Sequence, residues 1–202
     1  MHYQIRAMRR SDAIVVGRLH HLGIQTGFLS SLGQGFLTQL YAAIPSCPAG
    51  FGYVWEEPSG PLAGFIACAE SMRGLYRQAL LRRGVLMGLV MLPRAIVHPS
   101  VLRGAVETLR YPGEVGEELP PAEILSIAVA ESARHKGIGQ ALMRAALAEF
   151  SRRDVCRVKV AVGADNEPAN RFYQQCGFRL ALTREHHGLP MRVYVVDTGK
   201  AA

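Results

Sequence analysis

The stretch from residue 122 to residue 153 most constrains what this chain can fold into, because it changes abruptly from one local structure to another. "AEILSIAV" (122–129) is apolar and rich in β-branched residues, which predicts a strand. "GIGQALMRAALAEFSRR" (137–153) has helical apolar spacing, and the loop before it carries Arg134, His135 and Lys136. A helix that begins at a glycine turn presents unpaired backbone N–H groups and a positive dipole. The pattern therefore predicts a bound anion at this helix start.

The remaining segments mostly alternate between strand and helix patterns. A strand is expected over 3–8, a helix from Ser11 or Asp12 to about Leu22, a loop over 23–35 and a short helix over 36–44. Hairpins are predicted over 50–70 and 178–197, with a strand over 155–163 and a short helix over 166–177. Helical periodicity also extends over about 72–111, where a second helix is expected after Pro99. The predicted fold is mixed α/β, a mostly antiparallel central sheet flanked by helices, in a single domain of residues 1–202.

The positive charge of the chain is concentrated in one segment. The chain has a net charge of +7, and the segment from Ser71 to Tyr111 holds seven arginines and one acidic residue. The rest of the chain is nearly neutral and has no recognisable nucleic-acid-reading element, so a nucleic-acid partner is not expected. The four cysteines have no metal-ligand spacing and no apolar leader is visible, which predicts no metal and a cytoplasmic protein with reduced thiols.

The glycine loop does not match two common nucleotide-binding motifs. A Walker loop needs Gly-Lys-Ser/Thr, whereas here Lys136 precedes Gly137 and Ile138. A dinucleotide fingerprint needs a third small residue, and Leu142 stands at that position. A simple glycine turn with solvated charges is the remaining alternative to an anion site.

Two motifs in the right order resemble the GCN5-related N-acetyltransferase (GNAT) family. The first is the family's acetyl-CoA signature Arg/Gln-x-x-Gly-x-Gly/Ala, and the second is an Asn followed by Phe-Tyr and Gly-Phe. The matching residues are Arg134, Gly137 and Gly139 in the first, and Asn166, Phe172, Tyr173, Gly177 and Phe178 in the second. Together they cover residues 122–178, and Glu131 departs from the proline that many members have after the strand.

The resemblance implies an N-acetyltransferase that moves an acetyl group from acetyl-CoA to a primary amine by direct transfer in a ternary complex. It places the pyrophosphate of coenzyme A on backbone N–H groups of the loop and the helix start, with Arg134 and Lys136 adding charge and His135 facing solvent. The implied cofactor-binding residues of this loop are Arg134, His135, Lys136, Gly137, Ile138, Gly139 and Gln140.

The resemblance also implies where the thioester lies. Backbone N–H groups around Ile127, Ala128 and Val129 would face the thioester carbonyl, on a strand splayed from "VKVAV" with pantetheine in the gap. Asn166 matches a pantetheine-contacting Asn, and it is equally placed to cap the helix that contains Pro168. Tyr173 is the candidate general acid for the leaving thiolate, the alternative being a core tyrosine.

Glu123 is the candidate base that deprotonates the acceptor amine. Regular alternation would place it on one strand face with Leu125, Ile127 and Val129, where apolar neighbours would raise its carboxyl pKa. The alternative is a solvated residue at the strand start. Ala161 stands where ribosomal-protein N-terminal acetyltransferases carry a glutamate, which argues against simple equivalence with them.

The acceptor is not specified by the sequence beyond a small-molecule or peptide amine. In the family, acceptor pockets form from the first helices and the end of the chain, where the polar candidates are His20, His21, Thr26, His186 and His187. The basic helical segment over 71–111 would suit a lid, a homodimer face, a peripheral membrane contact or a site for an acidic or lipid-linked acceptor. Two other classes stay open, a non-catalytic acyl-CoA-binding module and a membrane-surface interaction protein built on that segment.

Overall fold

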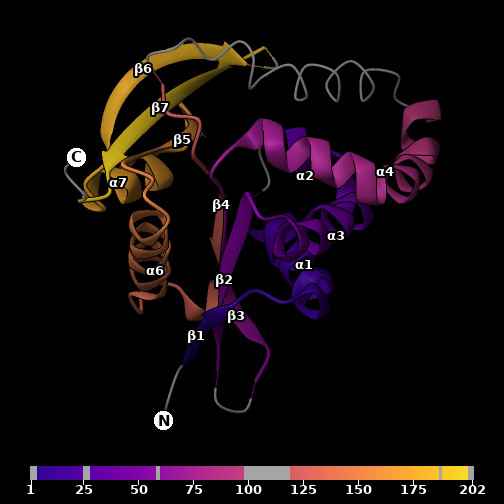
Figure 1. Cartoon of the computed structure of the whole chain (residues 1–202), viewed down its shortest axis with the longest axis horizontal. Helices are drawn as coiled ribbons and strands as arrows, with labels where there is room; N and C mark the ends of the chain where they lie inside the picture. Colours follow the sequence, from indigo (N-terminus) through magenta and orange to yellow (C-terminus); the bar gives the residue numbers. More distant parts are fainter. Residues whose placement is uncertain (1–3, 25–27, 58–59, 98–118, 187, 200–202) are drawn as a thin grey trace.

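The computed structural model describes residues 4–24, 28–57, 60–97, 119–186 and 188–199 (Figure 1). A seven-stranded sheet runs through it in the order β1-β2-β3-β4-β5-β7-β6, and every neighbouring pair is antiparallel except β4 with β5. This is the mixed, mostly antiparallel sheet predicted from the hairpins. The strands are β1 (Gln4–Ala7), β2 (Gly50–Glu56), β3 (Leu62–Ala69), β4 (Glu123–Val129), β5 (Arg157–Gly163), β6 (Arg179–His186) and β7 (Leu189–Asp197).

Helices cover both faces of the sheet (Figure 1). One face packs under α6 and α7, where Leu142, Phe150 and Tyr173 are buried, and the other packs under α1 and α3, where Val16 and Leu37 are buried. The helices are α1 (Ala13–Gly23), α2 (Phe28–Ser31), α3 (Gly33–Ala43), α4 (Met72–Val97), α6 (Ile138–Arg152) and α7 (Glu167–Gln175), with 3-10 turns at Arg10–Asp12, Ile44–Ser46 and Glu131–Ala133.

The segment predicted as helical over 72–111 begins with a single long helix, α4, which packs on α3. Its predicted second helix, after Pro99, lies outside the described residues. The predicted loop over 23–35 is partly wrong, because α2 occupies Phe28–Ser31 and α3 already begins at Gly33.

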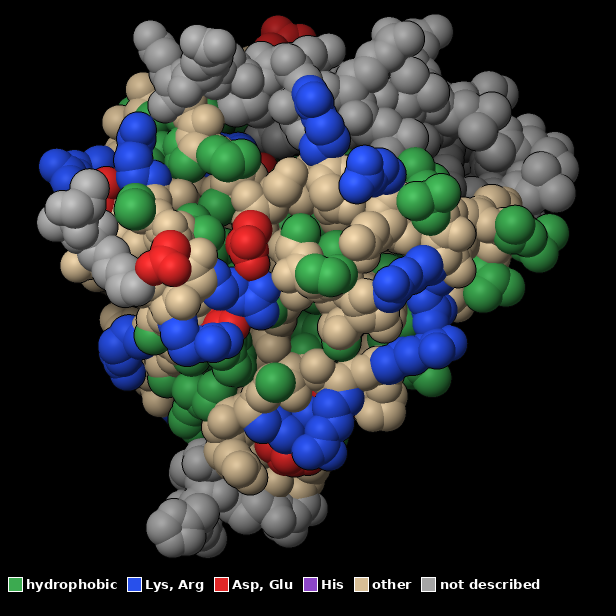
Figure 2. All heavy atoms as spheres, in the orientation of Figure 1, with side chains coloured by type: hydrophobic (Ala, Val, Ile, Leu, Met, Phe, Trp, Pro, Cys, Tyr) green, Lys and Arg blue, Asp and Glu red, His purple; other side chains and the backbone are tan. Residues whose placement is uncertain are grey.

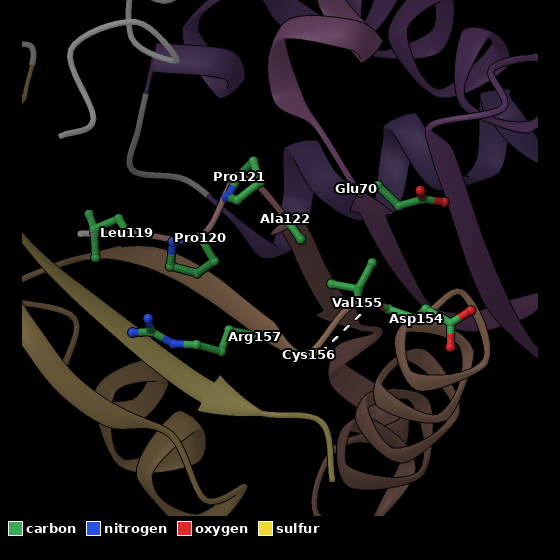
Figure 3. Close-up of a pocket in the computed structure, with 9 residues that line it drawn as sticks. All are labelled: Glu70, Leu119, Pro120, Pro121, Ala122, Asp154, Val155, Cys156 and Arg157. Carbon is green, nitrogen blue, oxygen red and sulfur yellow. Dashed lines mark hydrogen bonds between the residues drawn. The ribbon is translucent and has the colours of Figure 1, made fainter. Parts of the chain in front are cut away.

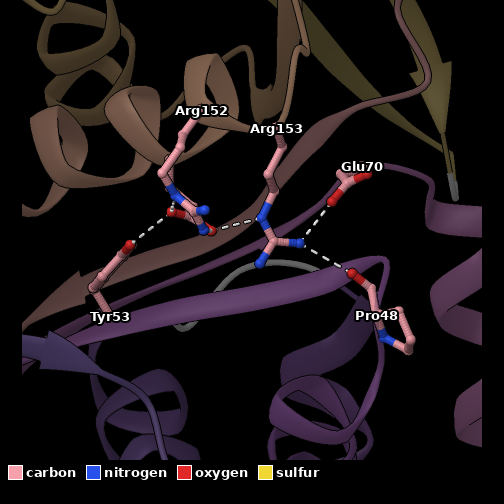
Figure 4. A network of polar contacts seen from close by, with 6 residues as sticks. Pro48, Tyr53, Glu70, Arg152 and Arg153 are labelled. Atoms are coloured by element: carbon pink, nitrogen blue, oxygen red, sulfur yellow. Dashed lines mark hydrogen bonds and ion pairs between the residues drawn. The ribbon is translucent and has the colours of Figure 1, made fainter.

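A network of ion pairs fixes the far end of α6 on the sheet (Figure 4). Arg153, the residue after α6, donates to Glu149 of that helix (2.6 Å), to Glu70 at the end of β3 (2.6 Å) and to the carbonyl of Pro48 (3.0 Å). Arg152 also binds Glu149, and these hydrogen bonds, led by that from Arg152, lower the pKa of Glu149 to about 2. Because the last turn of α6 is held in this way, the direction of its first turn is held too.

Candidate active site

An opening in the sheet separates β4 from β5. The two strands share a single register pair, Glu123 with Lys159, whereas β5 stays paired with β7 from Arg157 to Gly163. Beyond Glu123, β4 therefore has no strand partner on its β5 side, and the gap lies toward the carboxyl ends of both strands (Figure 1). This is the splay that the family resemblance implied.

A bulge at Leu125 interrupts the alternation of β4. Ala67 of β3 pairs with Ser126, and the next residue, Cys68, pairs with Ile124, so Leu125 is an extra residue. The faces confirm this. Ile124, Ile127 and Val129 pack with the cluster under α6 and α7, whereas Leu125 packs on the opposite side.

The prediction that Glu123 shares a face with Ile127 and Val129 is therefore wrong. Regular alternation was assumed, and one inserted residue moves Glu123 to the face that α1 and α3 cover. Its register partner there is Ala69, which belongs to the cluster on that face.

The bulge also decides where the backbone N–H groups of β4 point. The Ala122 carbonyl accepts from the Lys159 N–H of β5 (2.9 Å), while the Ala130 N–H donates to the Ala63 carbonyl of β3 (2.8 Å). In a regular strand, the backbone N–H and C=O groups of two residues at an even separation point to the same neighbouring strand. Ala122 and Ala130 are eight residues apart but point to opposite neighbours, because the extra residue at the bulge reverses the direction. Counting back from Ala130, the N–H groups of Ile127 and Val129 face the open edge, and that of Ala128 faces β3.

The loop after β4 leads directly into α6. The Arg134 N–H donates to the Glu131 carbonyl (3.2 Å), and its side-chain Nε donates to the Val129 carbonyl (3.4 Å). His135 and Gly137 have left-handed backbone conformations, with φ of 61° and 76°. Such a conformation is unfavourable for a non-glycine residue, so the surrounding turn must hold His135 in it. The side chains of Arg134, His135 and Lys136 are exposed.

The first turn of α6 presents free donors toward this loop. Gly137 is the residue before the helix, and the first backbone bond closes from Ala141 N–H to the Gly137 carbonyl (3.0 Å). The N–H groups of Ile138, Gly139 and Gln140 therefore have no acceptor within the helix.

The second predicted motif forms α7 and its anchor. Asn166 caps α7, its Oδ1 accepting from the Ala169 N–H (3.2 Å), as one of its two predicted roles required. Asn170, which the sequence reasoning did not single out, is buried and donates to the carbonyls of Gly163 (3.0 Å) and Asn166 (2.8 Å). Tyr194 of β7 donates to its Oδ1 (2.9 Å). Asn170 therefore ties α7 to the end of β5, and the only signal for it was its position one turn after the cap.

Tyr173 is buried on the inner side of α7. Only 6% of its surface is exposed, and its ring lies against Phe172, Phe178 and Tyr194. Burial raises the pKa of its phenol well above the ordinary value, so the hydroxyl keeps its proton at neutral pH. No described residue forms a hydrogen bond with that hydroxyl.

Glu123 forms a buried ion pair where β4 and β5 part. Its Oε2 lies 3.4 Å from Nζ of Lys159, and both side chains are almost fully buried. Lys159 also donates to the Pro120 carbonyl (2.6 Å). Burial raises the pKa of Glu123 and lowers that of Lys159, and the attraction between the two opposes both shifts.

A buried hydrogen-bonded chain runs from α2 to β4 through His20, which the sequence had suggested as an acceptor-pocket residue. The Ser30 hydroxyl donates to the Ile24 carbonyl, so its oxygen accepts from Nε2–H of His20 (3.1 Å). Nδ1 of His20 is then unprotonated and accepts from the Tyr41 hydroxyl, which accepts from Ser126 (2.7 Å). His20 is neutral and holds α1, α2 and α3 to the bulged part of β4. His21 is exposed, and Thr26, His187 and the His186 side chain lie outside the described part.

A hollow of about 430 Å³ lies at the opposite ends of β4 and β5 (Figure 3). Glu70, Asp154 and Arg157 contribute charges of both signs, and the rest of the lining is Leu119, Pro120, Pro121, Ala122, Val155 and Cys156. It is separated from the glycine loop by the length of the strands. It therefore has no place in an anion site at the start of α6.

The profile described as the acetyltransferase (GNAT) family matches residues 28–178. The chain belongs to this family. A comparison with curated protein sequences finds no significant match.

Solved structures of acetyltransferases share the fold of this GNAT protein. Ribosomal-protein-S18-alanine N-acetyltransferase from Escherichia coli matches with a TM-score of 0.63 and 12% identity, covering 100% of this chain and 97% of its own. NAA60 from Arabidopsis thaliana, in complex with acetyl-CoA, matches at 0.61 and 18%, covering 97% and 98%. Mutant forms of a spermidine/spermine N-acetyltransferase from Vibrio cholerae match at 0.56 and 16%, covering 98% and 95%.

The loop of this GNAT protein suits a diphosphate group in shape and charge. A Cβ added at Gly137 would meet nothing within 4 Å, so a ligand can approach the backbone there. A Cβ at Gly139 would lie 3.2 Å from Cε2 of Phe172, so this second glycine serves the contact between α6 and α7. The three free N–H groups and the exposed cations of Arg134 and Lys136 supply donors and positive charge. No helix among the described residues is long and apolar enough to cross a bilayer.

Proposed function

We propose that this GNAT acetyltransferase moves an acetyl group from acetyl-CoA to a primary amine, with both substrates bound at once. The observation that carries the proposal is the separation of β4 from β5 next to the free donors of α6. An elongated thiol ester can lie between the strands while its diphosphate meets the helix start.

The loop and the first turn of α6 bind the diphosphate in this proposal. The N–H groups of Ile138, Gly139 and Gln140 donate to it, and Arg134 and Lys136 add charge. The Arg134 N–H itself is engaged by Glu131, so Arg134 acts through its side chain. His135 is exposed and supplies its backbone turn. In this proposal, Asn166 at the start of α7 contacts the pantetheine arm and also caps the helix.

The chemistry is assigned to groups around the opening. Acetyl-CoA supplies the activated acetyl group. The N–H groups of Ile127 and Val129, which face the open edge, stabilise negative charge on the carbonyl oxygen. Ala128 does not donate to this carbonyl oxygen, because its N–H faces β3. Tyr173 holds a phenolic proton and gives it to the departing sulfur.

Glu123 is proposed as the group that takes the proton from the acceptor amine, directly or through water. Its position at the closed end of the opening places it on the side of α1 and α3. The ion pair with Lys159 opposes the rise in the carboxyl pKa that burial causes. The acceptor would therefore approach from the face opposite to Tyr173.

Acetyl-CoA binding tests the site. At a hundred times its dissociation constant, acetyl-CoA should stabilise the fold by ~2.7 kcal/mol, which raises the melting temperature by roughly 5–10 °C. Gly137→Glu should abolish this shift because it puts a carboxylate where the diphosphate approaches. Gly137→Gln is the matched control, since it has the same backbone strain and size without the charge, and it should retain part of the shift.

A sound folded sample that shows no shift with acetyl-CoA would refute the proposal. A shift without thiol release, for every amine in a panel of amino sugars, amino acids, peptides, polyamines and aminoglycosides, would favour the alternative of a non-catalytic acyl-CoA-binding module. The structural neighbours act on a ribosomal protein and on spermidine or spermine by their names, so the panel covers both kinds of acceptor.

A further inference from the structure

The outer side of α4 carries an apolar stripe that the rest of the described protein does not cover. Leu81, Val85 and Leu89 are 79%, 79% and 61% exposed. A spacing of four residues places them on one side of the helix, over ~12 Å of its length. The opposite side of α4 is buried, with Leu75 and Ala79 at the core.

The same helix carries only positive charge. Residues 72–97 contain five arginines and no Asp or Glu. Arg73 and Arg77 continue the spacing of the apolar stripe toward the start of α4, both are exposed, and no described residue forms an ion pair with either. Arg82 and Arg83 turn back to the protein, donating to the Ser46 carbonyl and to Gln39. Figure 2 shows blue and green side chains close together over the region where Figure 1 places α4.

We propose that this face of α4 rests on the surface of an anionic lipid bilayer. Leu81, Val85 and Leu89 enter the boundary between headgroups and acyl chains. Arg73 and Arg77, on the outward half of the same helix toward its start, meet lipid phosphates. The contact is peripheral and needs no acetyl-CoA, so it can be tested independently of the proposed function.

Two other occupants fit the face less well. A second copy of the chain would bring two helices without a single acidic residue against each other, which costs electrostatic energy. A nucleic acid would use the arginines but would gain nothing from three exposed aliphatic side chains. An anionic bilayer offers a partner to both kinds of side chain.

Flotation of the full chain with vesicles tests the proposal. Vesicles of one part phosphatidylglycerol to two parts phosphatidylcholine should carry the protein upward, and vesicles of pure phosphatidylcholine should carry much less. High salt should weaken the binding, because it screens the arginines. Adding or omitting acetyl-CoA should make no difference.

Two double variants separate the apolar and the charged contributions. Leu81→Ser with Leu89→Ser, and Arg73→Gln with Arg77→Gln, should each lower the vesicle partition coefficient roughly tenfold or more. Leu180→Ser with Leu189→Ser is the matched control, because these leucines on β6 and β7 are 53% and 52% exposed. This control should bind like the parent protein, and circular dichroism should show all variants folded.

Several results would overturn the proposal. One is the absence of binding to vesicles that contain phosphatidylglycerol, and another is equal binding to both kinds of vesicle. A third is a loss of vesicle binding in the β6–β7 control as large as in the α4 variants. A dimer in sedimentation equilibrium that dissociates when Leu81 and Leu89 are replaced would assign the face to a second copy. Binding of a homopolymeric RNA that depends on Arg73 and Arg77 but not on the leucines would assign it to nucleic acid.

Discussion

Acidification should destabilise this protein through His20, because this buried histidine stays neutral in the folded protein at a pH where the unfolded chain already binds a proton there. Burial, helped by the neighbouring His21, lowers the pKa of His20 from 6.5 to about 4. The unfolded chain therefore takes up a proton near the ordinary pKa while the folded protein does not. The stability that neutral His20 contributes is fully present above pH 6.5 and is lost as the pH falls toward about 4.

The size of the effect follows from the two titrations. Between about pH 7.5 and pH 4.5, the free energy of unfolding should fall by roughly 2.5 kcal/mol on account of this one group. For a chain of this size, that corresponds to a melting temperature lower by ~5–10 °C. The Glu149 carboxyl has its ordinary pKa of 4.5 in the unfolded chain and a pKa of about 2 in the folded protein, so the stability that it contributes is lost mainly below this window.

The assay is thermal unfolding from neutral to mildly acidic pH for the parent protein and His20→Gln. Glutamine keeps a neutral donor and acceptor in the chain between Ser30 and Tyr41, but it cannot titrate. Subtracting one pH profile from the other cancels the contributions of the other titrating groups to the free energy of unfolding. These include Glu123, whose raised pKa makes the folded protein more stable as the pH falls. His21→Gln is the control at an exposed neighbour. If His20→Gln keeps the full acid sensitivity of the parent, the neutral buried histidine deduced from the hydrogen bonds is wrong.

Three further substitutions test the site. Tyr173→Phe should leave acetyl-CoA affinity intact and slow the chemical step by ~10²–10⁴-fold in single-turnover measurements, and an unchanged step would make Tyr173 a core residue only. Glu123→Gln should cost ~3–5 kcal/mol in chemical denaturation because Lys159 is left buried without its partner, and Glu123→Leu with Lys159→Met should recover much of that loss. Gly139→Ala should destabilise by ~1–3 kcal/mol through its contact with Phe172, and Phe172→Leu should relieve part of this cost.

Local sequence patterns were sufficient for most of the fold. The hairpin over 50–70 and the helix that begins at Gly137 each combine a regular apolar period with a turn residue, and both signals lie within a few residues of each other. The two family motifs were local as well, and they led to the separated strands, the glycine loop and the Asn166 cap. Periodicity also found α4, because burial of one side of a helix leaves a mark every three or four residues.

The features that the sequence did not predict depend on contacts between distant residues. His20 is one of several polar residues near the first helix, and its partner Tyr41 is 21 residues away, while Ser126 is 85 residues beyond Tyr41. No local pattern distinguishes a buried histidine with two partners from an exposed one. Asn170 was missed for the same reason, since its bond from Tyr194 crosses from α7 to β7.

The bulge at Leu125 shows how one residue can change both faces and both edges of a strand. Without it, alternation from Ala122 would direct the N–H groups of Ser126 and Ala128 to the open edge and those of Ile127 and Val129 to β3. Glu123 would then share the α6–α7 face with the side chains of Ile127 and Val129. The extra residue instead keeps the acidic side chain on the face of α1 and α3, and it turns two N–H groups into the opening. The hydroxyl of Ser126, the residue next to the bulge, is held by Tyr41, so the His20 chain supports β4 where β5 no longer does.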